Sequence, residues 1–160
     1  MPRRTCLSSP LRLGTLAVFA LLPMLAQAQD ADEQAVKAAN GAFYAALSRT
    51  DEAAMGQVWV HAPYVAAIHP GSKAPIIGWE AVQQSWTDNF TRFPVTTVTP
   101  SEPMAFHRNG NTAWIVGTEA VHLKDTGGKE FQFTALATNV YEFQNGHWLM
   151  VVHHASLVPQ

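Results

Sequence analysis

Hydrophobic residues in the first half of the chain recur every three or four positions, which is the period of an α-helix. Asp30 and Glu33 resemble a capping box, so the pattern predicts that a first helix begins at Asp30. The apolar residues that share one face of this helix are Val36, Ala39, Phe43 and Leu47. The residues "RTD" after them are expected to end the helix.

Two further helices are predicted before residue 93. Asp51 is placed to cap a short one, and another is expected to follow Gly78. Their apolar positions are Met55, Val58 and Trp59 in the second helix and Val82, Trp86 and Phe90 in the third. Between them, "PYVAAIHPG" predicts a brief strand that ends in a turn.

After Phe93 the hydrophobic period changes to two, which indicates strands. The turn signals "RNGN", "DTGG" and "NG" divide this part into four long strands. Helices followed by an antiparallel meander predict an α+β fold, in which helices cover one face of a curved antiparallel sheet.

The last hairpin predicts which residues face the helices. A two-residue turn at Asn145 and Gly146 places Phe143 opposite Trp148 and, further along, Ala137 opposite His154. Cross-strand partners share a face, so His154 is expected to lie on the inner face with Asn139. His153 would then point outward.

The same reasoning through "DTGG" places Trp114 opposite Asn139, with Thr118 and His122 on the inner face. In this register no carboxylate points inward. The outer face would be apolar instead of polar, which favours a homodimer formed through it. Its apolar residues would be Ile115, Val121, Leu136, Val140, Leu149 and Val151.

The start of the chain has the layout of a bacterial secretory signal peptide. Three arginines precede the apolar run 13–25, and "AQA" offers small residues for cleavage after Ala28. The run is too short to span a membrane. We therefore expect residues 1–28 to be removed and a periplasmic or secreted protein to begin at Gln29.

Composition excludes several classes of function for a chain of residues 29–160. Cys6 would leave with the signal peptide, which excludes a thiol nucleophile, a disulfide and a cysteine zinc site. Loss of three arginines leaves seven basic residues against twelve acidic ones, a net charge of −5. This balance argues against a nucleic-acid partner, and nothing else in the chain suggests a membrane partner.

The order of elements and two segments resemble the SnoaL-like members of the nuclear transport factor 2-like superfamily. The segments are "WVHAPYVAAIHPGSKAPIIGWEAVQQSW" and "GHWLMVVHHAS". The group includes ketosteroid isomerases, polyketide cyclases and scytalone dehydratase. The resemblance implies that residues 29–160 form one cone-shaped domain of three helices on a bent sheet. It also implies a pocket at the open end for a small, largely apolar organic molecule.

Three positions can be compared with the isomerases in this group. "HPGSKAPIIG" is similar to the turn that carries their general-base aspartate, and the residue here is His69. "FYAAL" and "LATNVYEF" are similar to the segments with their two oxyanion donors, which here are Phe43 and Asn139. Phe43 cannot donate a hydrogen bond, and one such donor contributes roughly 2.7–4 kcal/mol. Steroid isomerase activity is therefore not expected.

The candidate catalytic residues are His69 and His154, which would exchange protons, and Asn139, which would polarise a carbonyl group. The resemblance implies cofactor-free isomerisation, dehydration or cyclisation. The predicted pocket residues are Phe43, Trp59, Trp86, Trp114 and Tyr141.

Two alternatives remain open from the sequence. No metal site is predicted, but His69, His154 and His122 are the residues that would converge on an ion if one were bound. The aromatic residues are individually more typical of a core, so the domain is alternatively a non-catalytic module for ligand binding or dimerisation.

Overall fold

A computed structural model describes residues 21–158 of the 160-residue chain, with side chains described from residue 31 onward. The first helix, α1 (Leu21–Ser48), begins before Asp30, so the predicted start of this helix is wrong. The residues between the apolar run and Asp30 are mostly Ala and Gln, which favour a helix and let it run through the capping box. Residues 1–20 of the predicted signal peptide lie outside the described residues, and cleavage after Ala28 stays a prediction.

Helices α2 (Glu52–Val58) and α3 (Trp79–Arg92) confirm the other two predicted helices. The side chain of Asp51 caps α2 by accepting a hydrogen bond from the amide of Ala54 (2.9 Å). The three predicted apolar residues of α3 are all buried. No helix within residues 21–158 is long and apolar enough to cross a membrane.

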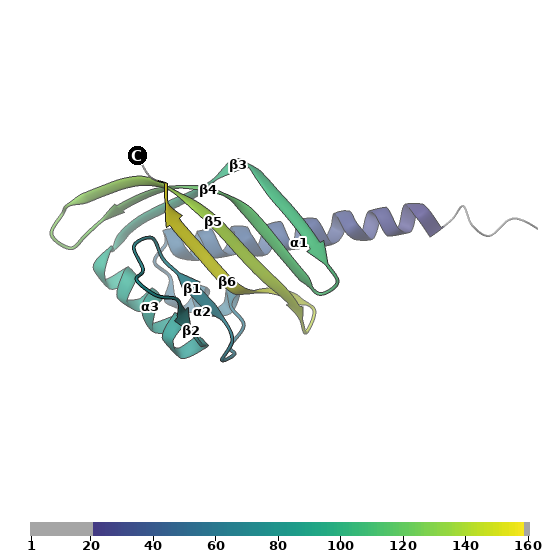
Figure 1. Ribbon diagram of the computed structural model, residues 1–160, viewed down its shortest axis with the longest axis horizontal. Helices are drawn as coiled ribbons and strands as arrows, with labels where there is room; N and C mark the ends of the chain where they lie inside the picture. The colour runs from purple at the N-terminus through teal and green to yellow at the C-terminus, as the bar shows by residue number, and fades with distance from the viewer. Residues whose placement is uncertain (1–20, 159–160) are drawn as a thin grey trace, which may run out of the picture.

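Six strands form one curved sheet in the order β2-β1-β6-β5-β4-β3. The four long strands confirm the predicted meander, and the sheet is antiparallel except for β1 and β6, which run parallel. The strands are β1 (Ala66–Ile68), β2 (Ile76–Ile77), β3 (Val95–Asn109), β4 (Thr112–Lys124), β5 (Glu130–Gln144) and β6 (His147–Leu157). Figure 1 shows β1 beside β6 in front of α1.

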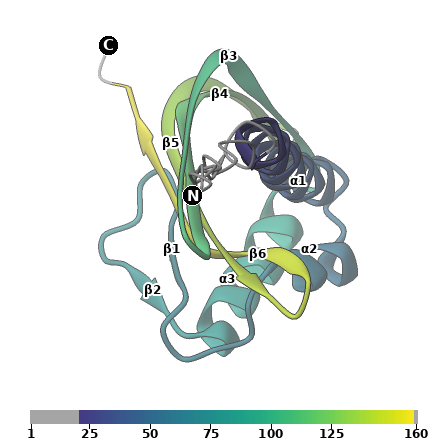
Figure 2. The ribbon, with the colours of Figure 1, turned by 90° about the vertical axis from the view of Figure 1, so that its right-hand side faces the viewer.

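The helices cover the concave face of this sheet. Figure 2 shows β3, β4 and β5 curling around α1, with α2 and α3 below it. Aromatic and aliphatic side chains from all three helices meet the inner residues of the strands in one continuous core. The α+β cone with three helices on a bent, unclosed sheet is therefore confirmed.

The hairpin between β5 and β6 follows the predicted register only at its tip. Asn145 and Gly146 have positive φ angles of 51° and 84°, as a type I′ turn requires. Tyr141 lies opposite Met150 as predicted, but Val140 lies opposite Val152, so Val151 is the extra residue of a β-bulge. A bulge exchanges the inward-facing and outward-facing residues of the rest of the strand. His153 therefore faces inward, and the prediction for His154 is wrong.

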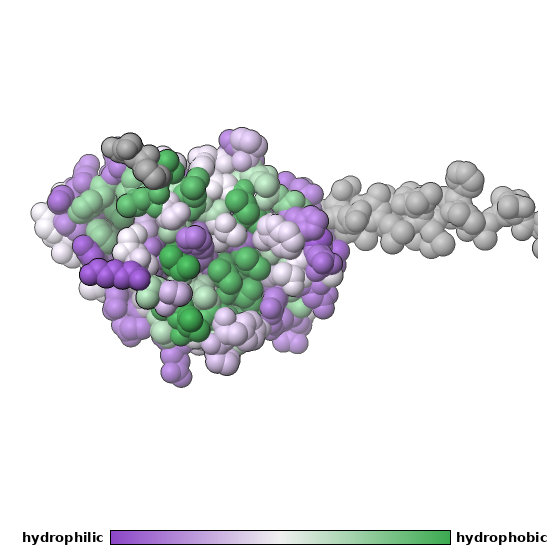
Figure 3. All heavy atoms as spheres, viewed as in Figure 1, coloured by the Kyte–Doolittle hydropathy of each residue, from purple (hydrophilic) through white to green (hydrophobic). Residues whose placement is uncertain are grey.

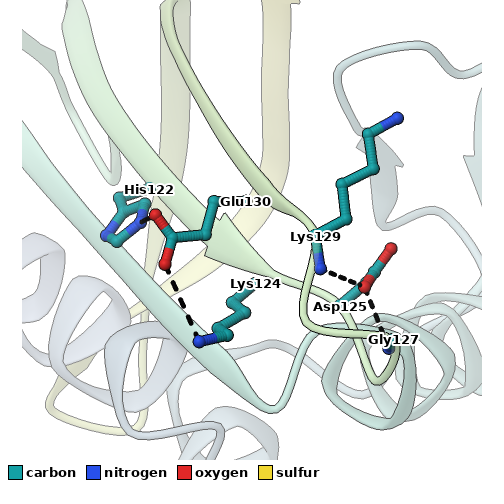
Figure 4. Close-up of polar contacts among 6 residues, drawn as sticks. All are labelled: His122, Lys124, Asp125, Gly127, Lys129 and Glu130. Carbon is teal, nitrogen blue, oxygen red and sulfur yellow. Dashed lines mark hydrogen bonds and ion pairs between the residues drawn. The ribbon is translucent and has the colours of Figure 1, made fainter.

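The loop between β4 and β5 reverses the parity of β4 in the same way. Lys124 lies opposite Glu130, which leaves residues 125–129 in the loop. This loop is one residue longer than the predicted pairing of Trp114 with Asn139 requires. Gly128 has a φ of 84°, and Asp125 accepts hydrogen bonds from the amides of Gly127 and Lys129 (Figure 4). Ile115 instead of Trp114 therefore lies opposite Asn139.

These two shifts change the predicted composition of both faces. Trp114 and His122 lie on the outer face, whereas Ile115, Val121 and Val151 are buried in the core. The prediction that these three residues form the outer face is wrong. Three other predicted residues of the outer face keep that position: Leu136, Val140 and Leu149.

Candidate ligand-binding and catalytic site

A cavity of about 380 Å³ lies between α3 and the inner face of the sheet. Its inner end is formed by buried residues and its rim by residues that are exposed or half-buried. The buried lining residues are Leu47, Trp86, Phe90, Thr96, Val98, Glu119, Val121, His153 and Ala155. The remaining lining residues are His69, Pro70, Asn89, Arg92, Phe93, Leu123, Phe131, Phe133 and Leu157.

His153 is the most deeply buried histidine at this cavity, with 2% of its surface exposed. Its Nδ1 lies 2.7 Å from Oδ1 of Asn139. An amide oxygen can only accept, so Nδ1 of His153 carries the proton and Nε2 keeps its lone pair. The ring also contacts Phe43, at 4.9 Å between centroids, and Trp86, at 5.7 Å. His153 therefore presents a fixed basic nitrogen in apolar surroundings.

Asn139 belongs to a buried hydrogen-bond network that extends to Glu119. Its Nδ2 donates to Oδ1 of Asn40 (2.8 Å) and to the hydroxyl of Tyr44 (3.2 Å). The Tyr44 hydroxyl donates to Oε1 of Glu119 (2.7 Å), and the Tyr141 hydroxyl donates to Oδ1 of Asn40 (2.8 Å). The network satisfies these buried groups and joins two side chains of the cavity, His153 and Glu119.

His69 approaches the cavity from the turn after β1. Its Nε2 lies 3.0 Å from Oγ of Ser85, whose hydroxyl donates to the carbonyl of Val82 (2.7 Å). The hydroxyl therefore accepts from His69, which leaves Nδ1 of His69 as the nitrogen with a lone pair. The imidazole packs edge-on against Trp86 at 4.4 Å, and its centroid lies 6.3 Å from that of His153.

Burial shifts the ionisation of all three groups towards the neutral form. It lowers the pKa of His69 to about 4. It also lowers the pKa of His153 to about 3, with smaller contributions from the neighbouring His69 and His154. Burial raises the pKa of Glu119, and the hydrogen bond from Tyr44 opposes this shift. The cavity thus holds two neutral bases and a carboxyl group biased towards its protonated form.

The predicted site residues occupy three different places. His69 and Trp86 line the cavity, and Asn139 lies behind it as the partner of His153. His154 and Trp114 lie on the outer face, because of the register shifts described above. The remaining predicted residues are buried in the core and do not line the cavity: Phe43, Trp59 and Tyr141.

The alternative of a histidine metal site does not fit this geometry. His122 and His154 lie on the outer face, away from His69. Within residues 21–158, no three His, Cys, Asp or Glu side chains converge as a metal site would require.

Sequence reasoning missed Glu119, His153 and the two residues of α1 that contact Asn139. Glu119 and His153 were missed because they were assigned to the outer face of the sheet. One extra residue in the loop before β5 places Glu119 on the inner face, and the bulge in β6 does the same for His153. For Asn40 and Tyr44, the sequence does contain a signal that indicates burial. They are four residues apart and fall within the apolar stripe of α1, where a buried polar residue requires a partner.

The fold and the cavity define an α+β cone built around a small internal pocket. Residues 36–160 match the SnoaL-like domain family, and the chain belongs to that family.

The chain is similar to several solved structures of the nuclear transport factor 2-like superfamily. A candidate dehydratase of that family from Streptomyces avermitilis is 26% identical with a TM-score of 0.75, and the match covers 82% of this chain and 99% of that one. A candidate calcium/calmodulin-dependent protein kinase type II association domain from Thiobacillus denitrificans is 32% identical with a TM-score of 0.60. That match covers 77% of this chain and 94% of the other.

A curated relative is the F-box protein SKIP8 of Arabidopsis thaliana, which is 31% identical over 133 residues. The match covers 80% of this chain but only 52% of the relative, so the chain spans about half of that protein.

Proposed function

We propose that the protein binds a small, largely apolar organic molecule in the cone cavity and catalyses a proton transfer on it without a cofactor. The observation that carries this proposal is that His153 and Glu119 both line the inner end of an apolar cavity and are joined through Asn139 and Tyr44. His153 is a neutral base and Glu119 is a carboxyl group whose pKa is raised by burial. A nitrogen with a free lone pair and a carboxyl group biased towards its protonated form, in one cavity, supply the acceptor and the donor that acid–base catalysis requires.

The size and the walls of the cavity support the choice of ligand. A volume of about 380 Å³ lies at the small end of the range for pockets that bind organic molecules. Most of the lining is aliphatic or aromatic, and the polar groups are few and fixed by hydrogen bonds. Such a pocket suits a molecule of one or two rings with one or two polar groups.

Dehydration of a β-hydroxy carbonyl compound is the reaction that these groups suit best. Nε2 of His153 would remove a proton from the carbon next to the carbonyl, and Glu119 would give its proton to the departing hydroxyl. A carbon–carbon double bond forms, the carbon–oxygen bond breaks and water leaves. The proton on His153 then returns to Glu119 through water, which restores both groups. The similarity to a candidate dehydratase supports this assignment.

His69 would act as a second partner in this reaction, through a hydrogen bond. Its free Nδ1 and its place beside Trp86 suit a hydrogen-bond acceptor that orients the substrate hydroxyl. Asn139 would not contact the substrate. It would position His153 by accepting from Nδ1.

Ligand binding can be tested with N-phenyl-1-naphthylamine, an uncharged dye that fluoresces in apolar pockets. Leu123→Trp should fill the cavity and abolish dye binding. Gln132→Trp places the same side chain on the outer face at the same end of the sheet, and it should bind the dye like the wild type. Equal binding by both variants would place the ligand elsewhere and contradict the proposal.

Catalysis can be tested by deuterium incorporation from D₂O into a panel of β-hydroxy ketones. His153→Asn keeps a hydrogen-bond donor for Asn139 but removes the base, and its exchange rate should fall about 10²–10⁴-fold. His154→Asn makes the same exchange on the outer face and should retain the rate. A panel that shows no exchange with the wild type would leave a binding module without catalysis and refute the catalytic half of the proposal.

We also propose that two copies associate through the outer face of the sheet. Leu136 is 51% exposed and Val116 is 41% exposed, and Val140 and Val152 are half-buried beside them. Figure 3 shows hydrophobic residues gathered in the middle of this face, with hydrophilic residues around them. A contiguous apolar surface of this kind marks an interaction site.

Export with cleavage after Ala28 belongs to the same proposal. It rests on the arrangement of arginines, apolar run and small residues at the start of the sequence. An exported position would give the cavity access to small molecules outside the cytoplasm.

A further inference from the structure

Two cations lie over aromatic rings of the cavity wall: Arg92 lines the cavity itself, and Lys129 contacts a lining ring from beside it. Arg92, in the last turn of α3, has its guanidinium carbon 4.9 Å from the centroid of the Phe93 ring. The Phe93 ring packs edge-on against Phe131, at 5.8 Å between centroids. Nζ of Lys129 lies 4.9 Å from the centroid of Phe131. Both rings line the cavity, so each cation lies over a ring of the cavity wall.

Neither of these cations is paired with a carboxylate in the part of the chain that the structure describes. The neighbouring Lys124 behaves differently, because its Nζ lies 3.7 Å from Oε1 of Glu130. Figure 4 shows this pair, with the side chain of Lys129 directed away from both Glu130 and Asp125. One unpaired cation at the rim and a second one beside it are therefore held on a chain whose acidic residues outnumber its basic ones.

The charge along the cavity changes with depth. Arg92 is the only cationic side chain among the lining residues, and it lies at the rim. Glu119 is the only lining carboxyl group, and it is 2% exposed. Between them the walls are apolar, with Phe90, Val121 and Phe133. The cavity thus offers an anion a place at its rim and an uncharged body a place inside.

Helix geometry alone does not account for this arrangement. An arginine in the last turn of a helix is favoured by the helix dipole, which explains the charge of Arg92 but not its place on the cavity side. Lys129 lies in the loop between β4 and β5, where its amide donates to Asp125, and has no such role. A guanidinium group that stacks on a ring still has its N–H groups free for bidentate contact with a carboxylate.

We propose that the ligand is an amphipathic carboxylic acid, with its carboxylate at the rim between Arg92 and Lys129 and its apolar body in the cavity. This inference rests on the proposed function, since it names the class of ligand for the same pocket. It narrows the proposed dehydration to substrates that carry a carboxylate remote from the reacting hydroxyl.

The test compares two ligands of nearly the same shape and different charge, 2-naphthoate and 2-naphthamide. Each is titrated into the full chain to displace N-phenyl-1-naphthylamine at pH 7.5 and low ionic strength. The wild type should bind the acid about ten times more tightly than the amide, and 0.5 M NaCl should reduce this preference because salt screens exposed charges.

Arg92→Gln with Lys129→Gln should remove the preference, because the affinity for the acid should fall about tenfold relative to that for the amide. Lys124→Gln is the matched control, because its charge is already paired with Glu130, and it should keep the preference. Equal affinity of the wild type for acid and amide, or a preference that survives in the double variant, would overturn the inference. If the dye itself does not bind the wild type, the proposed function fails and this inference fails with it.

Discussion

The buried imidazole of His153 should make the protein less stable in mild acid. Its pKa is about 3 in the folded chain, against an ordinary value near 6.5 in an unfolded chain. Between these values the unfolded chain binds a proton that the folded chain does not bind. Folded stability is therefore fully present above pH 6.5 and falls as the pH drops below it.

The size of the effect follows from the linkage relation. At pH 5.0 the unfolded His153 is almost fully protonated and the folded one is not. This difference lowers the free energy of unfolding by about 2 kcal/mol relative to pH 7.5. His69 acts in the same direction, since its folded pKa is about 4. Glu119 acts in the opposite direction, because its pKa is raised and its protonation on acidification favours the folded chain.

Comparison with His153→Asn isolates the contribution of His153, because His69 and Glu119 are present in both proteins. Urea unfolding followed by far-ultraviolet circular dichroism gives the free energy of unfolding at each pH. Loss of the ring should destabilise the variant at pH 7.5. The difference in unfolding free energy between the wild type and the variant should be about 2 kcal/mol smaller at pH 5.0. A difference between the two proteins that stays constant with pH would refute the burial of a neutral imidazole at this position.

Three other predictions concern the buried network, the outer face and the start of the chain. Tyr44→Phe should cost about 1–3 kcal/mol of unfolding free energy, because it leaves a buried carboxyl without its donor, whereas Tyr64→Phe on the surface should cost under about 0.5 kcal/mol in the same urea titration. Leu136→Glu should convert a dimer into monomers in light-scattering measurements, with Gln132→Glu as the control that stays dimeric; a monomeric wild type would contradict the proposed interface. N-terminal sequencing of exported protein should begin at Gln29, and an intact start would exclude cleavage after Ala28.

The fold could be predicted from the sequence because it depends on patterns that extend over many residues. The helical period that contains Val82, Trp86 and Phe90 extends over more than two turns, and no single residue decides it. The change to a period of two after Phe93 separates helices from sheet in the same robust way. The beginning of α1 was misjudged because the capping box at Asp30 lies inside a segment that continues as a helix.

The site was predicted less well because it depends on which face of the sheet each strand residue occupies. One additional residue in a loop or a bulge exchanges the two faces. The turn at Asn145 was predicted correctly, yet the bulge at Val151 exchanged the roles of His153 and His154. A bulge carries no strong sequence signal when the extra residue is an ordinary valine. His69 was placed correctly because its position follows from a turn and not from strand parity. Glu119 faces inward only because the loop between β4 and β5 is one residue longer than predicted.

The central claim is that His153, and not His154, forms the wall of a ligand cavity together with His69. The most direct measurement is a nitrogen-15 correlation spectrum of the histidine side chains, recorded while N-phenyl-1-naphthylamine is added. The imidazole signals of His153 and His69 should move together as the dye binds, and those of His154 should stay in place. Movement of His154 with no change at His153 would contradict the account.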